Sequence, residues 1–123
     1  MLAAILESGD PERLYTGLSL LVSAASEGRP VRALATFGAL VPLLDPRLET
    51  RALATSHVIE AERPAFARTR AELRDAAAPS IWACAAAVQA TGADWATVGE
   101  RLAGVTSTPQ FLRDVGDAQL VVV

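Results

Sequence analysis

The side chains best suited to chemistry are one thiol and one imidazole. Cys84 is the only cysteine of the chain and His57 its only histidine. A cysteine thiolate is a strong nucleophile, and a neighbouring imidazole can activate it as a general base. Nothing in the sequence brings His57 to Cys84, so we interpret His57 as a surface or packing residue. These two side chains also fall short of a tetrahedral metal site, so we expect no metal and no organic cofactor.

Two interpretations of Cys84 remain open from the residues around it. The stretch SIWACAAAV, residues 80–88, is apolar, and free cysteine is often buried like a small apolar residue. The same stretch predicts a strand that ends at Cys84 and a helix that begins directly after it. Backbone N–H groups and the partial positive charge at a helix start favour a thiolate. Cys84 is therefore the candidate catalytic residue, with simple packing as the alternative.

Strands and helices alternate around this position along the whole chain. Short apolar runs bounded by Gly or Pro predict strands at residues 1–8, 30–37, 80–84, 104–108 and 118–123. Apolar spacing, caps and breakers predict helices at residues 11–27, 64–78, 85–91, 95–98 and 109–115. Residues 39–58, broken by Pro42 and Pro46, are interpreted as a short helix or a packed loop. Thr108 is the expected cap of the last helix.

This alternation is typical of an α/β domain with a parallel sheet covered on both faces. We predict one domain, residues 1–123, with three α/β/α layers and a five-stranded, mostly parallel sheet. Ligands of such sheets bind beyond the carboxyl ends of the strands. Besides Cys84, the predicted substrate or ligand cleft at that edge consists of Ser8, Gly9, Thr36, Phe37, Gly38 and Ala85.

Composition and charge argue against nucleic-acid and membrane partners. The chain has 123 residues, of which 51% are hydrophobic, and a net charge of −3, so we expect no nucleic-acid partner. We expect no signal peptide, because the first residues lack a basic segment and a small-residue cleavage site. We also expect no membrane partner, because no apolar run reaches membrane-spanning length. A single cysteine favours a cytoplasmic location. A solvated helix face with local ion pairs is expected for Glu60, Glu62, Arg63, Arg68, Arg70, Glu72, Arg74 and Asp75.

Two blocks of the sequence resemble the DsrE/DsrF-like family. The first is ESGDPERLYTGLSLLVSAASEGRPVRALATFGAL, with a strand, a Ser-Gly turn, a long helix and a second strand ending in Thr-Phe. The second is SIWACAAAVQATGADWATVGERLAGVTSTPQFLRDVGDAQLVVV, with a strand ending in Cys and a final strand. The resemblance covers residues 3–44 and 80–123, and the segment 45–79 is not diagnostic.

The resemblance implies a three-layer α/β/α fold related to the flavodoxin-like folds. It also implies a sulfur carrier that assembles as a trimer or hexamer. In the family a cysteine at the position of Cys84 accepts a sulfane sulfur as a persulfide and passes it from a donor protein to an acceptor protein. The chain departs from the family just after that cysteine, because Ala85, Ala86 and Ala87 stand where relatives often have a polar residue.

Two further functions belong to different classes. One is a non-catalytic oligomeric binding or assembly protein that uses the strand-end cleft for a small ligand or partner. The other, a nucleotide binder, is disfavoured because the SGD turn at residues 8–10 lacks a glycine-rich phosphate loop.

Overall fold

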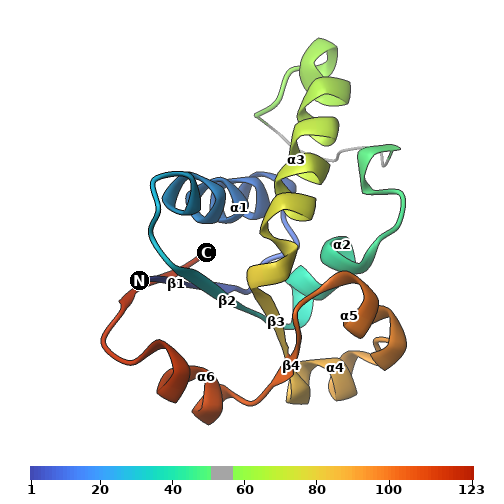
Figure 1. The fold of residues 1–123 in the computed structure, drawn as a ribbon. Helices are drawn as coiled ribbons and strands as arrows, with labels where there is room; N and C mark the ends of the chain where they lie inside the picture. Colours follow the sequence, from blue (N-terminus) through green and yellow to red (C-terminus); the bar gives the residue numbers. More distant parts are fainter. Residues whose placement is uncertain (51–56) are drawn as a thin grey trace.

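A parallel sheet lies at the centre of the computed structural model, which describes residues 1–50 and 57–123 (Figure 1). Within those residues the five strands are β1 (Leu2–Leu6), β2 (Val31–Ala35), β3 (Ile81–Cys84), β4 (Gly104–Thr106) and β5 (Gln119–Val122). They are arranged in the order β4-β3-β2-β1-β5, and each neighbouring pair is parallel. The predicted five-stranded α/β sheet is confirmed, and the sheet is parallel throughout.

Helices cover both faces of this sheet. They are α1 (Pro11–Ser26), α2 (Leu40–Leu44), α3 (Arg63–Ala77), α4 (Ala85–Thr91), α5 (Trp95–Arg101) and α6 (Thr108–Val115). Figure 1 shows α1 and α3 above the sheet and α6 below it, with α2 and α5 beside the ends of the central strands. The predicted three-layer α/β/α architecture is therefore confirmed.

Local chemistry explains why α1 forms where the sequence predicts. The carboxylate of Asp10 accepts a hydrogen bond from the backbone N–H of Arg13, and Pro11 occupies the first turn, where its missing N–H costs nothing. The apolar stripe of α1 is buried against the sheet. Gly17 brings the helix close to the sheet, since a Cβ there would lie 2.7 Å from Cδ2 of Leu6.

The strand register divides the sheet residues into two faces, because paired residues of parallel strands point to the same side. Leu6 points to α1, whereas Arg32 points to α6 and forms an ion pair with Asp114 at 3.2 Å. Leu6 and Arg32 therefore identify the two faces, and we call the face that α6 covers the α6 face. Its residues are Ala3, Ile5, Arg32, Leu34, Trp82, Cys84, Thr106, Leu120 and Val122. Cys84 therefore lies on the face that α6 covers.

The solvated face predicted for α3 is wrong at two positions. Arg70 and Arg74 are buried, and their guanidinium groups donate hydrogen bonds to the backbone carbonyls of Leu48, Pro42 and Asp45. The segment from α2 to the one-turn 3₁₀ helix Leu48–Thr50 lies against this side of α3. A sequence pattern cannot show that cover, because it comes from residues more than twenty positions away.

Smaller differences concern the ends of the helices. Ser107, and not Thr108, caps α6 by accepting a hydrogen bond from the N–H of Gln110. Helix α5 continues to Arg101, beyond the predicted end at Val98. The helix predicted from Pro64 begins at Arg63. The segment predicted as a short helix or packed loop contains α2, and its residues 51–56 lie outside the described residues.

Candidate functional site

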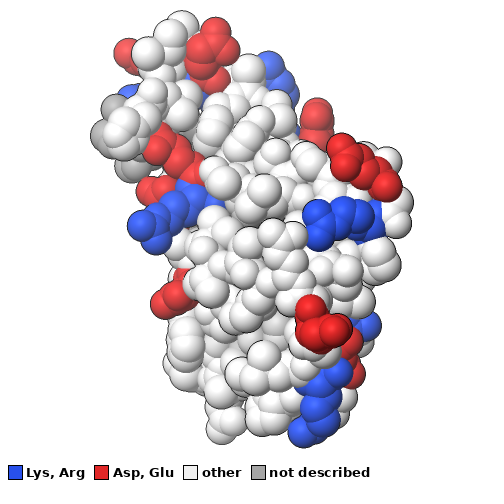
Figure 2. Space-filling model, turned by 90° about the vertical axis from the view of Figure 1, so that its left-hand side faces the viewer, with Lys and Arg blue, Asp and Glu red and all other residues white. Residues whose placement is uncertain are grey.

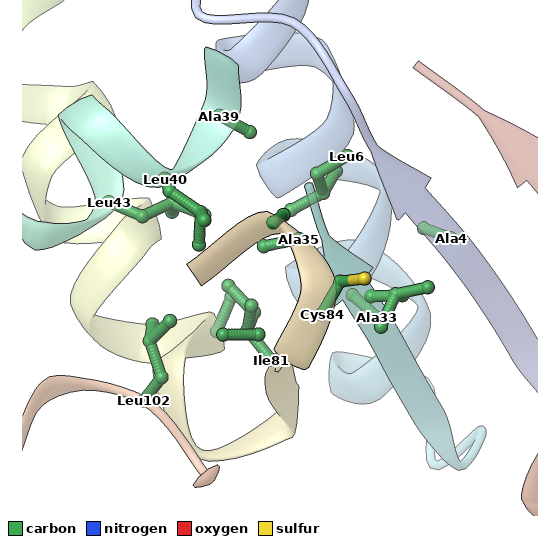
Figure 3. Close-up of a cluster of buried hydrophobic side chains, with 14 of the residues drawn as sticks. Ala4, Leu6, Ala33, Ala35, Ala39, Leu40, Leu43, Ile81, Cys84 and Leu102 are labelled. Carbon is green, nitrogen blue, oxygen red and sulfur yellow. The ribbon is translucent and has the colours of Figure 1, made fainter. Parts of the chain in front are cut away.

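Cys84 lies at the carboxyl end of β3 and directly before α4, as the sequence predicts. Its side chain is 6% exposed and belongs to the buried apolar cluster shown in Figure 3. Its Sγ lies 4.0 Å from the hydroxyl oxygen of Thr108, in the first turn of α6. The fold thus brings the thiol to the strand-end edge and covers it with α6.

His57 lies on the other side of the sheet from Cys84. Its Nδ1 is 2.8 Å from a carboxylate oxygen of Glu12, and its backbone N–H donates to the other oxygen of the same carboxylate. Glu12 belongs to α1, whereas Cys84 points to α6 on the opposite face. The interpretation of His57 as a surface residue is confirmed, since its side chain is 78% exposed.

The loops that follow β1 and β2 meet at the edge where the cleft is predicted. A Cβ at Gly9 would lie 2.5 Å from the carbonyl oxygen of Gly38, so the two loops pack backbone against backbone. The N–H of Thr36 donates to the carbonyl of Leu6 at 2.9 Å and ties the loops together. The tight contact explains why both positions carry glycine.

Phe37 stands out in the second of these loops. Its φ angle is +35°, a conformation that bulky L-residues rarely adopt, and its side chain is 51% exposed. Such strain is concentrated at functional sites in proteins.

Ala85 lies one strand further along the edge, where it begins α4.

A polar pocket of about 360 Å³ opens beyond the carboxyl ends of β1 and β5. Glu7, Ser8, Arg13, Val122 and Val123 line it. The chain proceeds from β1 through β4 in one direction across the sheet and then crosses to the far side of β1 to form β5. The pocket therefore lies at the topological switch point, where parallel α/β sheets bind ligands.

The structure thus brings one predicted cleft residue, Ser8, into this pocket and adds Glu7 and Arg13. Sequence reasoning missed Arg13 because the switch point depends on which strand becomes the neighbour of β1. Ser8 also accepts a hydrogen bond from the N–H of Asp10, which holds the turn that leads into α1. The remaining predicted cleft residues lie along the same edge outside the pocket.

A second, mainly apolar pocket of about 290 Å³ lies between α2 and the α4–α5 connection. Its lining consists of Leu40, Val41, Leu44, Thr91, Ala93, Asp94 and Thr97. Hydrogen bonds from the side chain and backbone N–H of Thr97 hold the pKa of the Asp94 carboxyl below its ordinary value. Asp94 thereby caps α5, so its presence in the pocket lining is explained by its role in starting that helix.

Neither the family models nor the curated proteins provide a match to this chain. None of the helices in the described part of the chain combines the length and apolar character of a membrane span. Across residues 1–50 and 57–123, no group of three or more potential metal ligands is close enough to hold an ion. The strand-end edge, with the polar pocket beside β1 and with Cys84 at the end of β3, is the candidate functional site.

Proposed function

We propose that this chain is a non-catalytic binding protein that takes a small polar ligand in the pocket lined by Glu7, Ser8 and Arg13. The observation that carries the proposal is the coincidence of this polar pocket with the switch point of the sheet. Rigid strand ends and the first turn of α1 supply the walls, which is how α/β folds preorganise a ligand site.

The charged groups of the pocket favour a zwitterionic ligand. The Arg13 guanidinium is a donor for a carboxylate, and the Glu7 carboxylate is an acceptor for an ammonium group. A small amino acid presents both groups within a few bonds of each other. A purely anionic ligand would meet the negative charge of Glu7, so we expect it to bind more weakly.

Titration with glycine tests this function. In two-dimensional NMR spectra, glycine at millimolar concentration is expected to shift the amide signals of Ser8 and Arg13, and acetate at the same concentration to shift them less. Arg13→Gln is expected to weaken glycine binding by about ten- to a hundredfold, because a charge-assisted hydrogen bond contributes about 1.5–3 kcal/mol. The matched control is Arg113→Gln, since Arg113 bonds to Gln110 on α6.

Unchanged amide signals in the wild-type protein would contradict the proposal. So would equal affinities of the Arg13→Gln and Arg113→Gln variants, because the pocket would then bind without its cation.

A second candidate function is sulfur transfer through Cys84, as in the DsrE/DsrF-like family that the sequence resembles. The position of Cys84 favours it, because the thiol ends β3, precedes α4 and lies beside the Thr108 hydroxyl. In this reaction the Cys84 thiolate attacks the outer sulfur of a donor persulfide. The new S–S bond forms on Cys84 as the donor S–S bond breaks, and the donor leaves as a thiolate.

Burial is the obstacle to this second function. Because Sγ faces the first turn of α6, a donor reaches it only when Thr108 and the residues around it move aside. We therefore rank sulfur transfer below ligand binding.

Mass spectrometry after incubation with a persulfide donor tests sulfur transfer. If Cys84 is a carrier, the wild-type protein gains about 32 Da, the mass of one sulfur atom, and Cys84→Ser gains nothing. A wild-type protein with unchanged mass excludes the carrier function. If the protein gained 32 Da only after denaturation, the native thiol would be inaccessible to the donor. That result would also exclude the carrier function.

Self-association and a cytoplasmic location complete the proposal. Several large apolar side chains are exposed, and they are Leu20, Phe37, Val41, Ile59, Trp95, Leu112, Leu120 and Val122. Figure 2 shows broad uncharged areas between the charged groups on one side of the molecule. Exposed apolar surface on this scale supports a homo-oligomer. The single cysteine supports a reducing compartment.

A further inference from the structure

The apolar pocket between α2 and the α4–α5 connection has the size and lining of a site for a small molecule. Its volume of about 290 Å³ is close to the lower end of the range for ligand pockets, about 300–1,000 Å³. Its apolar side chains are those of Leu40, Val41, Leu44 and Ala93. No described residue lines both this pocket and the polar one. The apolar pocket therefore suits a separate ligand, with one ring or a short alkyl chain as its body.

The walls of this pocket belong to the folded core. Leu40 is 1% exposed, and Leu44 and Ala93 pack against the buried apolar cluster. Helix α2 also lies against α5 (Figure 1), which fixes the two sides of the pocket relative to each other. Val41 differs from these residues, because it lines the pocket and yet is 72% exposed. An apolar ligand removes this side chain from water, which favours binding.

Hydrogen bonds within the protein already use the hydroxyl groups of the lining. The Thr91 hydroxyl donates to the carbonyl of Ala87 at 2.7 Å, inside α4. The Thr97 hydroxyl donates to Oδ2 of Asp94 at 2.7 Å, and the Thr97 N–H donates to the same oxygen at 3.3 Å. Because both hydroxyl protons are engaged, recognition of a polar group on the ligand depends on Asp94.

Of the lining residues that the structure describes, Asp94 alone carries a charge. The Thr97 hydroxyl, and after it the Thr97 N–H, lowers the pKa of this carboxyl below its ordinary value, so it is ionised at neutral pH. A carboxylate accepts about four hydrogen bonds, and the described donors, Thr97 and the N–H of Ala96, supply three of them. Asp94 is exposed, so its remaining acceptor position is open to a ligand.

The carboxyl ends of two helices add partial negative charge. Leu44 is the last residue of α2, and Thr91 is the last residue of α4. The final carbonyl groups of a helix lack partners within it and are partially negative. The start of α5 carries about half a positive charge at most, which the full charge of Asp94 exceeds. The pocket therefore favours a cation over an anion.

We propose that this pocket binds an amphiphilic amine, whose ammonium group pairs with Asp94 and whose apolar body lies between α2 and the α4–α5 connection. This site is independent of the polar pocket and recognises a different chemistry. The polar pocket provides an arginine and a glutamate, whereas this one provides a carboxylate and apolar walls. Phenethylammonium, a primary amine with a phenyl ring on a two-carbon chain, presents both required features and serves as the probe.

NMR titration with phenethylammonium tests the proposal. At millimolar concentration it is expected to shift the amide signals of Leu44, Ala93 and Thr97. The anion 3-phenylpropionate, which has the same ring and chain, and ethylammonium, which lacks the ring, are expected to shift them less. Equal shifts with 3-phenylpropionate, or unchanged signals with phenethylammonium, would overturn the proposal. Shifts confined to Ser8 and Arg13 would overturn it too, because the amine would then occupy the polar pocket.

The Asp94→Asn variant separates recognition from folding. Asparagine caps a helix as well as aspartate does, so α5 is expected to keep its start while the charge is lost. The dissociation constant for phenethylammonium is expected to rise about fivefold, the effect of removing an exposed ion pair. Asp117→Asn is the matched control, because Asp117 precedes β5, at the sheet edge opposite β4 and its neighbour α5. Equal dissociation constants of the two variants would contradict the role of Asp94.

Val41→Lys adds a positive charge to the lining without removing a buried side chain. Because Val41 is exposed, the lysine variant is expected to fold, and its charge to weaken phenethylammonium binding about fivefold. Glycine binding in the polar pocket is expected to stay the same. A Val41→Lys variant that binds phenethylammonium as tightly as the wild-type protein would place the amine elsewhere and overturn the proposal.

Discussion

Replacing Arg74 with methionine lowers the free energy of unfolding by about 3 kcal/mol. Arg74 is 5% exposed, and its Nη1 donates to the carbonyls of Pro42 and Asp45, at the end of α2. Methionine fills much of the same volume but leaves both carbonyls without this donor. The contact between Nε of Arg74 and Asp75 contributes little to stability, because the Asp75 carboxylate is mainly exposed.

A neighbouring charge reduces the size of this loss. Burial, and then the charge of Arg74, lower the pKa of the Arg70 guanidinium below its ordinary value. Removing Arg74 relieves that repulsion, so the expected loss stays below the upper range for breaking a buried charged network. Arg70 keeps its own hydrogen bond to the carbonyl of Leu48.

Urea unfolding of Arg74→Met and Arg68→Met measures the effect. Arg68 lies on the exposed side of the same helix, so its replacement is expected to change stability by no more than about 0.5 kcal/mol. Equal stabilities of the two variants would mean that Arg74 does not hold α2. Because Leu40 and Leu44 of α2 line the apolar pocket, Arg74→Met is also expected to alter that pocket and leave the polar one intact.

Replacing Gly9 with alanine is expected to cost about 1–3 kcal/mol, the usual cost of forcing an extra methyl group into a tight contact. The new Cβ would lie 2.5 Å from the carbonyl oxygen of Gly38, which belongs to the backbone and cannot rotate away. The loops after β1 and β2 must therefore separate. Since Ser8 lines the polar pocket, this change is expected to weaken glycine binding as well.

Gly99→Ala is the matched control for this substitution. Gly99 lies inside α5, and a Cβ there meets nothing within 4 Å, so alanine is expected to stabilise the protein by about 0.5–1 kcal/mol. The unfolding temperature is therefore expected to fall below that of the wild-type protein in Gly9→Ala and to rise above it in Gly99→Ala. A stable Gly9→Ala variant with an unchanged affinity for glycine would show that the loops accommodate the methyl group without moving.

Local chemistry made the fold class predictable. Asp10 and Pro11 start α1, and Gly28 with a φ of +82° follows its end. The short apolar runs predicted as strands all contain strands of the sheet. The place of Cys84 between β3 and α4 was predictable for the same reason, because strand, turn and cap signals act over a few residues. Helix ends were less certain, as at Ser107, where neighbouring hydroxyl residues compete for one cap position.

The amino-acid sequence, through caps, breakers and apolar period, was enough to establish a parallel α/β domain and to bring Cys84, Ser8 and Thr36 to one edge of its sheet. Tertiary structure decided the rest. The crossing of β5 to the far side of β1 created the pocket of Glu7 and Arg13, and α6 came to cover Cys84. The segment 40–50 buried Arg70 and Arg74. These outcomes depend on contacts between residues far apart in the chain, which local periodicity does not encode.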